Sequence, residues 1–448
     1  MIKIHCREFV EWASESALFD DCKYHAVLCD PPYGIAFMGK KWDDHGGPEA
    51  FQLQAKIWGE AMIPLLYPGA LVFMFAGTRM WHRLAAGMED AGFHLWDTVM
   101  WLHGQGFPKA QDISKLIDKA NGDPRTKIVG RYQPPGMDKP WNLKNAKDER
   151  TVPLSASSRN NLEILAPGSD TSAPWVGHKT PQLKPAWEPI LCFRAPNNGK
   201  KYAELALEYG SGSLNIENAR IGTSKDVPAS PRRAAQGPAY GDLSNDPANG
   251  TGWNPNMGRY PANLVLDEKV ASMLDMQSGA RKAGASVTGQ EPSAPTKNDY
   301  GEYERIPFQG YEDSGGASRF FYCTKASRRE REEGLGDVEA AKTDSTRSAE
   351  QPSMNGGEGN PYKRGCKEVK NNHPTVKPID LNRWLASLLL PPESVASRRI
   401  IIPFAGVGSE IIGASLAGWD EIVGVEMDSK YCDIAKSRIA HWVKQETK

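Results

Sequence analysis

Apolar runs and amphipathic stretches alternate over the first hundred residues of the chain. Tyr24–Cys29 is a short apolar run that stops before a pair of prolines, and Gly69–Ala76 is apolar throughout. Runs that are apolar at every position are typical of strands buried on both faces. Because proline cannot continue a central strand, a loop should begin at Asp30. The pattern predicts strands at 24–29, 69–76 and 94–102, and helices from about 51 to 64 and over 80–91.

The C-terminal end repeats this alternation. Apolar positions predict a helix over Leu381–Leu390, which two prolines then stop. A strand, a helix, a strand and a closing helix follow at 399–402, 409–417, 421–426 and 431–444. Strands that alternate with helices through short turns indicate an α/β sheet covered by helices.

The middle of the chain lacks this regularity. Stretches such as 286–298 and 343–359 are rich in Ser, Gly, Pro, Asn and charge, which is typical of loops or disorder. Strand-like islands remain at Glu188–Ala195, Tyr260–Leu266 and Arg319–Ala326. We interpret the middle as an insertion with its own small structure between two parts of one sheet. The predicted parts are residues 1–103, 104–370 and 371–448.

Composition narrows the class of protein. No run approaches the roughly 18 uninterrupted apolar residues of a membrane span. The N-terminal segment lacks the apolar core of a signal peptide. The seven cysteines are scattered and form no C-x-x-C, which argues against a disulfide framework and a thiolate zinc site. We therefore expect a globular, cytoplasmic protein that binds no metal.

Charge is distributed unevenly along the chain, although the formal net charge is only −1. Residues 1–103 hold 8 lysines and arginines against 13 acidic residues, whereas residues 104–225 hold 18 against 12. A basic middle in an otherwise acidic protein favours contact with a polyanion there. Lysines that merely solvate a loop-rich segment would give the same pattern, so both interpretations stay open.

The first candidate for chemistry follows the strand predicted at 24–29. This tetrapeptide is Asp30-Pro31-Pro32-Tyr33. The carboxyl ends of strands are where α/β proteins form their sites. The Asp30 carboxylate and the rigidly held Pro31 carbonyl could both accept N–H hydrogens of an aromatic amine and localise its lone pair. Tyr33 offers a face on which a planar base could stack. The alternative is a simple turn, since Asp before proline is good turn chemistry.

The second candidate lies between the strand at 399–402 and the following helix. This segment is Phe404-Ala405-Gly406-Val407-Gly408. Glycines there allow close backbone approach to a ligand, and Glu426 ends the next strand where an acidic residue can bind ribose hydroxyls. Ile411 occupies the place of the third glycine of a dinucleotide site. The pattern thus favours a ligand with a ribose but no pyrophosphate, and a tight turn without a ligand is the alternative.

A third segment, Asn372-His373-Pro374-Thr375-Val376-Lys377-Pro378, precedes the helix predicted at 381–390. Taken together, the three segments resemble the β-class (permuted) DNA amino-methyltransferases, which use S-adenosylmethionine to methylate adenine N6 or cytosine N4. In that family the catalytic tetrapeptide comes first, the target-recognition region second and the cofactor motif last. The motifs cover the two ends of this chain, and the middle agrees with the family in position only.

The resemblance implies a fold and a set of roles. The fold would be the Rossmann-like methyltransferase α/β sandwich, a seven-stranded sheet with one antiparallel strand, and residues 104–370 would hold the target-recognition region. Asp30, Pro31 and Pro32 would bind the target amine, with Tyr33 stacked on a base flipped out of double-stranded DNA. S-adenosyl-L-methionine would be the cofactor. Its predicted contacts are Phe404, Ala405, Gly406, Gly408 and Glu426, with His373, Thr375 and Lys377 against the methionine end.

The resemblance leaves three points open. The tetrapeptide favours adenine N6 over cytosine N4, and RNA or a protein glutamine are alternative acceptors. Ile402 and His5 stand where the family usually has Asp, so a weakly active DNA-binding protein that keeps the fold is the alternative from another class. Homodimers are common in the family, the host would be a bacterium or its phage, and a restriction partner is undetermined.

Candidate DNA contacts, each with a solvated surface as the alternative, are Lys40, Lys41, Trp42, Arg319, Lys325, Arg328 and Arg329.

Overall fold

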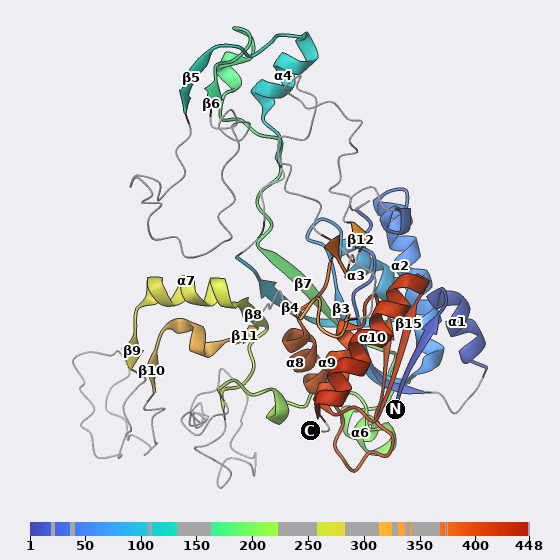
Figure 1. Cartoon of the computed structure of the whole chain (residues 1–448). Coiled ribbons are helices and arrows are strands. Elements are labelled where there is room, and N and C mark those ends of the chain that lie inside the picture. The colour runs from blue at the N-terminus through green and yellow to red at the C-terminus, as the bar shows by residue number, and fades with distance from the viewer. Residues whose placement is uncertain are drawn as a thin grey trace, which may run out of the picture. The chain divides into compact units, whose positions relative to one another are not determined.

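The computed structural model forms two compact units, each described here by itself (Figure 1). The first, the sheet unit, comprises residues 1–105, 186–339 and 370–448, and the second, the small unit, comprises 106–185 and 340–369. Within these spans the structure describes residues 1–18, 23–35, 41–104, 106, 110–131, 163–222, 258–282, 313–324, 330–336, 341–342, 368–371, 373 and 375–446.

One mixed sheet organises the sheet unit. Among the described residues it has nine strands, in the order β1-β15-β14-β2-β3-β7-β4-β8-β11. Neighbours are parallel except around β7, which is antiparallel to both β3 and β4. The strands in sheet order are β1 (Ile2–Cys6), β15 (Glu421–Glu426), β14 (Arg399–Pro403), β2 (Tyr24–Cys29), β3 (Leu66–Phe75), β7 (Trp187–Arg194), β4 (His94–Leu102), β8 (Leu264–Asp267) and β11 (Tyr322–Thr324).

The α/β class and the single antiparallel strand are as predicted, but the expectation of seven strands is wrong. The short strands β8 and β11 add to the edge formed by β4 and bring the count to nine. The middle of the chain is also not one separate insertion, because β7, β8 and β11 all come from it and pair within the main sheet. Strands of three or four residues show too little periodicity to reveal their partners in the sequence.

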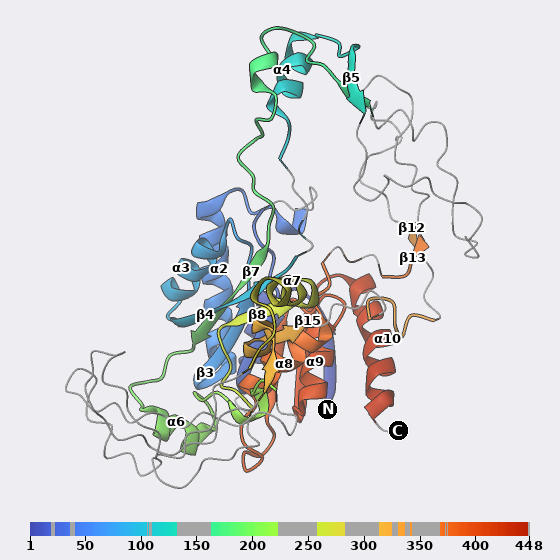
Figure 2. The same cartoon turned by 90° about the vertical axis from the view of Figure 1, so that its left-hand side faces the viewer.

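Helices cover both faces of the sheet, which gives three layers (Figure 2). Successive residues of β2 point to opposite faces, so Leu28 packs into one buried cluster and Val27 into the other. On the Val27 face lie α1 (Phe9–Ser16), α2 (Pro48–Met62) and α3 (Trp81–Asp90). On the Leu28 face lie α8 (Ile379–Leu389), α9 (Ser409–Ala417) and α10 (Ser429–Glu446). This double coverage explains why the strand is buried at every position.

Smaller elements complete the sheet unit. They are η2 (Lys41–Asp43), η3 (Ile63–Leu65), α6 (Tyr202–Tyr209), η7 (Glu217–Ala219), α7 (Glu268–Ser278), η9 (Ala317–Phe320) and the antiparallel pair β9 (Arg281–Lys282) and β10 (Ser314–Gly315). Pro64, predicted to end or kink a helix, lies in η3 at the end of α2. In the part of the chain that the structure describes, no helix is long and apolar enough to cross a membrane.

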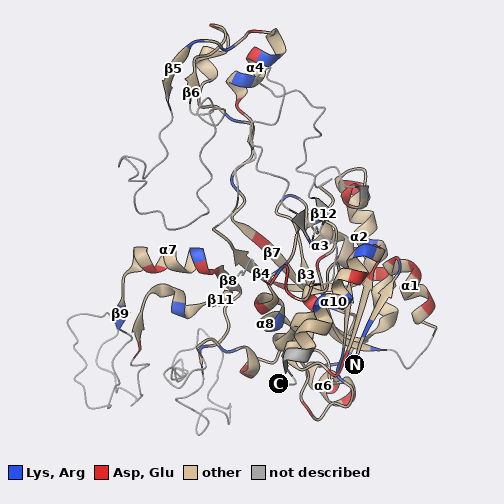
Figure 3. Cartoon of the chain, in the orientation of Figure 1, with Lys and Arg blue, Asp and Glu red and all other residues tan. Residues whose placement is uncertain are grey.

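The small unit is built around one buried carboxylate. Asp118, on α4 (Ile113–Asn121), pairs with the Arg125 guanidinium and accepts hydrogen bonds from the Gly168 amide and the Ser169 hydroxyl. Along α4 the small unit carries both basic and acidic residues (Figure 3). The remaining elements are β5 (Ile128–Arg131), β6 (Glu163–Leu165), η6 (Ala173–Trp175), β12 (Ala341–Lys342) and β13 (Glu368–Val369).

The added strands are anchored to α8 through one aromatic pair, and this can be tested. The Tyr322 ring stacks on Trp384 at a centroid distance of 4.7 Å, and its hydroxyl donates to the Asp380 carbonyl over 2.9 Å. Tyr322→Ala should destabilise the protein by about 2–3 kcal/mol, because it removes both the stacked ring and the hydrogen bond. Urea unfolding measures this. Tyr260→Ala, at a ring that is 63% exposed, is the control, and equal effects of both variants would contradict the packing described.

Candidate active site

Two of the predicted motifs meet where the order of the sheet reverses. From β2 the chain proceeds to β3 on one side, and from β14 to β15 on the other, while β14 and β2 are parallel neighbours. Asp30 follows β2 and Phe404 follows β14, so both loops leave the same edge of the sheet. The carboxyl ends of strands at such a reversal are where open α/β sheets bind ligands.

A buried ion pair joins the first motif to the third. The Lys377 ammonium donates to the Asp30 carboxylate (Oδ2) over 2.8 Å and to the Tyr33 hydroxyl over 2.9 Å. The Tyr33 hydroxyl in turn donates to the other Asp30 oxygen over 2.8 Å. Burial by itself lowers the pKa of Lys377, but the carboxylates of Asp30 and Glu188 outweigh it and raise that pKa overall. The lysine is therefore charged, and both oxygens of Asp30 are engaged.

Two further carboxylates, which the sequence did not single out, belong to this site. Glu188, on β7, lies 3.3 Å from the Lys377 ammonium and 3.2 Å from the Tyr33 hydroxyl. Glu410, in the first turn of α9, is 5% exposed, and burial followed by repulsion from Asp30 raises its pKa to about 7. Glu188 begins one of the predicted strand-like islands, but only the pairing of β7 with β3 brings it to Asp30. Three carboxylates thus surround one ammonium.

A fourth carboxylate fixes the loop that follows Asp30. Asp43, 1% exposed in η2, accepts hydrogen bonds from the backbone amides of Tyr33, Gly34 and Ile35 over 2.6, 2.9 and 3.2 Å. Gly34 has φ +67°, and a Cβ there would come within 2.5 Å of the Phe51 ring. The residues that follow Asp30 are therefore held in one conformation before any ligand binds.

The second motif forms a tight loop under a third segment of chain. Phe404, Gly406 and Gly408 all have positive φ, which L side chains rarely adopt and which glycine tolerates. The Glu426 carboxylate accepts the Gly406 amide over 2.8 Å and the Asp428 amide over 2.8 Å. Ala405 is buried within the core beneath this loop. The predicted ribose-binding residue is thus fixed at the end of β15, beside the loop.

Arg438 on α10 supports this loop from below. The side chain is fully buried, and one guanidinium nitrogen donates to the Val407 carbonyl over 2.6 Å and to the Ser409 hydroxyl over 3.1 Å. Burial lowers the pKa of Arg438 to about 10. The sequence offered no signal for this role, because an arginine on an amphipathic helix reads as a solvated side chain.

His373 and Thr375 lie in the segment that passes over the loop. The His373 ring packs edge-on against Tyr431 at 4.7 Å, and a Cβ on Gly406 would lie 3.3 Å from its Nε2. Burial lowers the pKa of His373 to about 4, although Asp30 and a hydrogen bond with the Thr375 backbone act in the opposite direction. Thr375 is half-buried. Lys377, predicted to contact the methionine end of the cofactor, donates to Asp30 and Tyr33 in the structure, and its contact with the cofactor stays a prediction.

The residues predicted to contact DNA are only partly described. Trp42 is half-buried in η2, whereas Lys40, Lys325, Arg328 and Arg329 and the Lys41 side chain lie outside the described part of the chain. Arg319 is engaged within the protein, since it pairs with Asp313 at 3.2 Å and donates to the Gly315 and Gly316 carbonyls. Its guanidinium therefore has little capacity left for a phosphate.

The two residues that depart from the family pattern, Ile402 and His5, both pack against apolar or aromatic neighbours. Ile402 is fully buried in β14, within the same apolar cluster as Ile400. The His5 ring lies 5.3 Å from Trp12, and burial followed by repulsion from Lys3 lowers the pKa of His5. Ile402 thus serves the core of the sheet.

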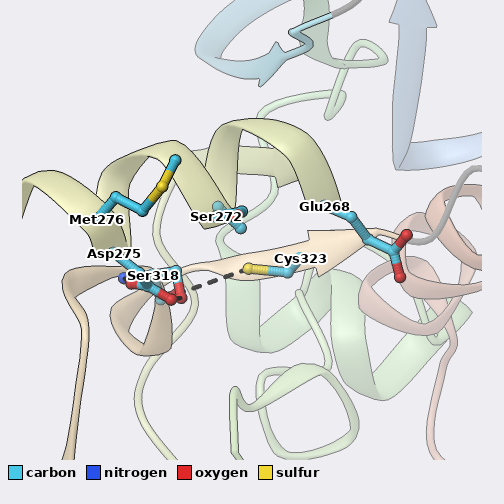
Figure 4. A pocket seen from close by; sticks show the side chains of 7 residues that line it. Glu268, Ser272, Asp275, Met276, Ser318 and Cys323 are labelled. Atoms are coloured by element: carbon cyan, nitrogen blue, oxygen red, sulfur yellow. Dashed lines mark hydrogen bonds between the residues drawn. The ribbon is translucent and has the colours of Figure 1, made fainter. Parts of the chain in front are cut away.

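A separate cavity of about 650 Å³ lies between α7 and β11 (Figure 4). Asp275, Met276, Ser318 and Cys323 are among its lining side chains. None of the residues of the three motifs lines it. It therefore belongs to the edge that β8 and β11 add to the sheet.

The site at the reversal fits a nucleoside-type cofactor. Gly408 lets the loop of Phe404–Gly408 pack closely on α10, since a Cβ there would lie 3.2 Å from Ala435 and Ile439. Glu426 beside the loop supplies carboxylate oxygens for ribose hydroxyls. In the described residues no group of three or more His, Cys, Asp and Glu side chains could hold a metal ion.

Comparison with known families decides the relationship. The family model of the N6/N4-type DNA methylases matches residues 24–437, which span nearly the whole chain. The chain belongs to this family. The resemblance predicted from the three motifs is thus confirmed.

Individual relatives of this chain are distant. The Type II methyltransferase M.HindIII of Haemophilus influenzae is 22% identical over 233 residues, which cover 44% of this chain and 60% of the relative. The chain therefore spans about three fifths of that relative's length. Among solved structures, it aligns with the M1.HpyAVI–SAM complex (12% identity, 98% and 100% of the two chains, TM-score 0.35). It also aligns with the cytosine-N4-specific PvuII DNA methyltransferase (9% identity, 98% and 86%, TM-score 0.41).

The contribution of Arg438 to the free energy of unfolding, through its contacts with the glycine loop, can be measured. Arg438→Met should lower the free energy of unfolding by about 3 kcal/mol, because the Val407 carbonyl loses a buried, charge-assisted donor. Lys436→Met, at a side chain that is 59% exposed on the same helix, is the control and should change it by less than about 0.5 kcal/mol. Chemical unfolding of both variants provides the comparison. An effect of Arg438→Met no larger than that of the control would mean that the loop stands without it.

Proposed function

We propose that this DNA methylase transfers a methyl group from S-adenosylmethionine to the exocyclic amine of a base in double-stranded DNA, and that the base is adenine, methylated at N6. The observation that carries the proposal is the position of Asp30 at the reversal of the sheet, beside the glycine loop. An amine acceptor and a nucleoside site are adjacent there. Cytosine N4 is the alternative target, because the same geometry suits both amines.

Asp30 and the Pro31 carbonyl would bind the amine through its two N–H groups. The lone pair of an aromatic amine is delocalised into its ring, and two acceptors fixed in advance favour the form in which it is localised on nitrogen. Each Asp30 oxygen already accepts one hydrogen bond in the present structure, but a carboxylate oxygen can accept a second, so an incoming amine can bind beside Lys377 and the Tyr33 hydroxyl or replace one of them. Lys377 can move to Glu188, which already lies 3.3 Å away. The exchange keeps the ammonium paired.

The cofactor would occupy the loop of Phe404–Gly408. When bound, S-adenosylmethionine supplies an electrophilic methyl group on a cationic sulfur. Glu426 would accept hydrogen bonds from the ribose hydroxyls, and His373 would cover the loop. The Asp30 and Glu188 carboxylates together outweigh the single charge of Lys377, which suits a cationic cofactor.

The DNA base would have to leave the duplex to reach Asp30. Unstacking and unpairing cost a few kcal/mol, and stacking on Tyr33 with hydrogen bonds to Asp30 would offset that cost. The basic stretch at 104–225 would contact phosphates and supply affinity independent of sequence. Target recognition by the middle of the chain and dimerisation stay predictions.

The direct test is transfer of labelled methyl from S-adenosylmethionine to unmethylated genomic DNA, followed by mass spectrometry of the nucleosides. N6-methyladenine is the expected product. N4-methylcytosine would keep the mechanism and change the base. Absence of label in DNA, with the cofactor still bound, would overturn DNA as the substrate. Absence of cofactor binding would favour a DNA-binding protein that keeps only the fold.

Substitution of Asp30 should affect methyl transfer but not cofactor binding. Asp30→Asn should lower the transfer rate by about 10³-fold, because the amide cannot offer two acceptor oxygens to the amine and Lys377. The dissociation constant for S-adenosylmethionine, measured by calorimetry, should change by less than about threefold. Glu89→Gln, at an exposed carboxylate on α3, serves as the control variant. Loss of cofactor binding in step with loss of transfer would assign Asp30 to the cofactor site.

A further inference from the structure

Glu410 is a buried carboxylate for which the proposed mechanism has so far no use. It lies in the first turn of α9, directly after the glycine loop. The Asn382 amide on α8 donates to its Oε1 over 3.3 Å. Gly413 permits this contact, because a Cβ there would come within 2.6 Å of Asn382 Cβ and 2.7 Å of the Arg383 amide. The helices are thus packed closely around an acidic group.

The charged groups that face Glu410 come from three elements. Asp30 follows β2, Lys377 precedes α8, and Arg438 lies on α10. Both cations are committed to other partners: Lys377 donates to Asp30 and Tyr33, and Arg438 donates to carbonyls and to a hydroxyl. Burial and then Asp30 raise the pKa of Glu410, whereas Lys377 and Arg438 lower it.

The Asn382 amide and the residue's own backbone amide bind the Glu410 carboxylate, and neither contact supplies a positive charge. A buried carboxylate in such surroundings is costly unless a cation neutralises it. The position of Glu410 indicates which cation that is. It follows the loop that would hold the cofactor, and it faces Asp30, which would hold the amine. The methyl-bearing sulfur has to lie between those two places for transfer to occur. The Glu410 carboxylate would therefore face the positively charged sulfur of the cofactor.

We propose that the Glu410 carboxylate binds the cationic methylsulfonium of S-adenosylmethionine and makes the site distinguish the charged cofactor from its uncharged thioether product. This inference deepens the proposed function and rests on it. The product S-adenosylhomocysteine carries no charge on sulfur, so Glu410 gives it no electrostatic stabilisation. The same carboxylate that strengthens binding of the cofactor thus leaves the product more weakly held.

The test compares both ligands on both proteins by calorimetry at pH 8. Glu410→Gln keeps the shape and the contact with Asn382 but removes the charge. Its dissociation constant for S-adenosylmethionine should rise by about tenfold or more, which is what loss of one partly buried charge interaction gives. Its dissociation constant for S-adenosylhomocysteine should stay within about twofold of the wild-type value.

The pH dependence supplies a second, independent readout. Below its pKa of about 7, Glu410 is protonated, and binding of a cation has to expel that proton. Wild-type affinity for S-adenosylmethionine should therefore fall by about tenfold from pH 8 to pH 6. The affinity of Glu410→Gln for the same ligand should be flat over that range, and so should the affinity of either protein for S-adenosylhomocysteine.

Matched variants separate the possible outcomes. Glu426→Gln should weaken both ligands equally, since both carry the ribose, and Glu393→Gln on the exposed surface should weaken neither. Asn382→Leu leaves the Glu410 charge in place and should keep the discrimination, which tests the claim even if Glu410→Gln folds poorly. Equal weakening of both ligands in Glu410→Gln would overturn the proposal and assign the residue to the methionine ammonium or to folding. No weakening would overturn it as well. If wild-type protein binds the cofactor but methylates no DNA, the proposed function fails while this assignment is still decided by the binding data.

Discussion

The buried pair of Asp30 and Lys377 is the interaction on which the site depends. It joins residues 347 positions apart in the chain over 2.8 Å, with both side chains largely withdrawn from solvent. Removal of one partner from such a pair leaves an uncompensated charge in a medium where charges are poorly screened. Asp30 follows β2 and Lys377 precedes α8, whose apolar side chains pack in the same buried cluster as those of β2, so the packing of the core and the chemistry of the site are specified together.

The residues around the Asp30–Lys377 pair fix the two loops of the site but leave Lys377 a second partner. Asp43 fixes the loop after Asp30 through three backbone amides, and Arg438 fixes the glycine loop from the other side. Glu188 offers Lys377 a second carboxylate, so the lysine can leave Asp30 without losing its charge partner. Rigid loops around an exchangeable cation are what a transfer site needs, because the acceptor must be in place before the substrate arrives.

Much of this arrangement could be predicted from the sequence, and the rest could not, for physical reasons. Strands such as β2 and β15 have apolar centres and clear ends, and motif residues lie at or directly after those ends. Glu188 could not be found in this way, because it reaches Asp30 only through antiparallel pairing of β7 with β3. Arg438 and Asp43 act through backbone groups far away in the chain or across a loop, and such contacts leave no periodic signal. β8 and β11 are too short for the sequence to predict which strands they pair with.

The central claim is that Asp30 and Lys377 stabilise each other as a buried pair, and a double-mutant cycle on unfolding free energy tests it most directly. Lys377→Met alone should destabilise the protein by about 3 kcal/mol, since it leaves carboxylates without their cation. Combined with Asp30→Asn, the same change should cost at least about 1.5 kcal/mol less. Additive effects of the two substitutions would contradict the account, because they would mean that the two groups do not depend on each other.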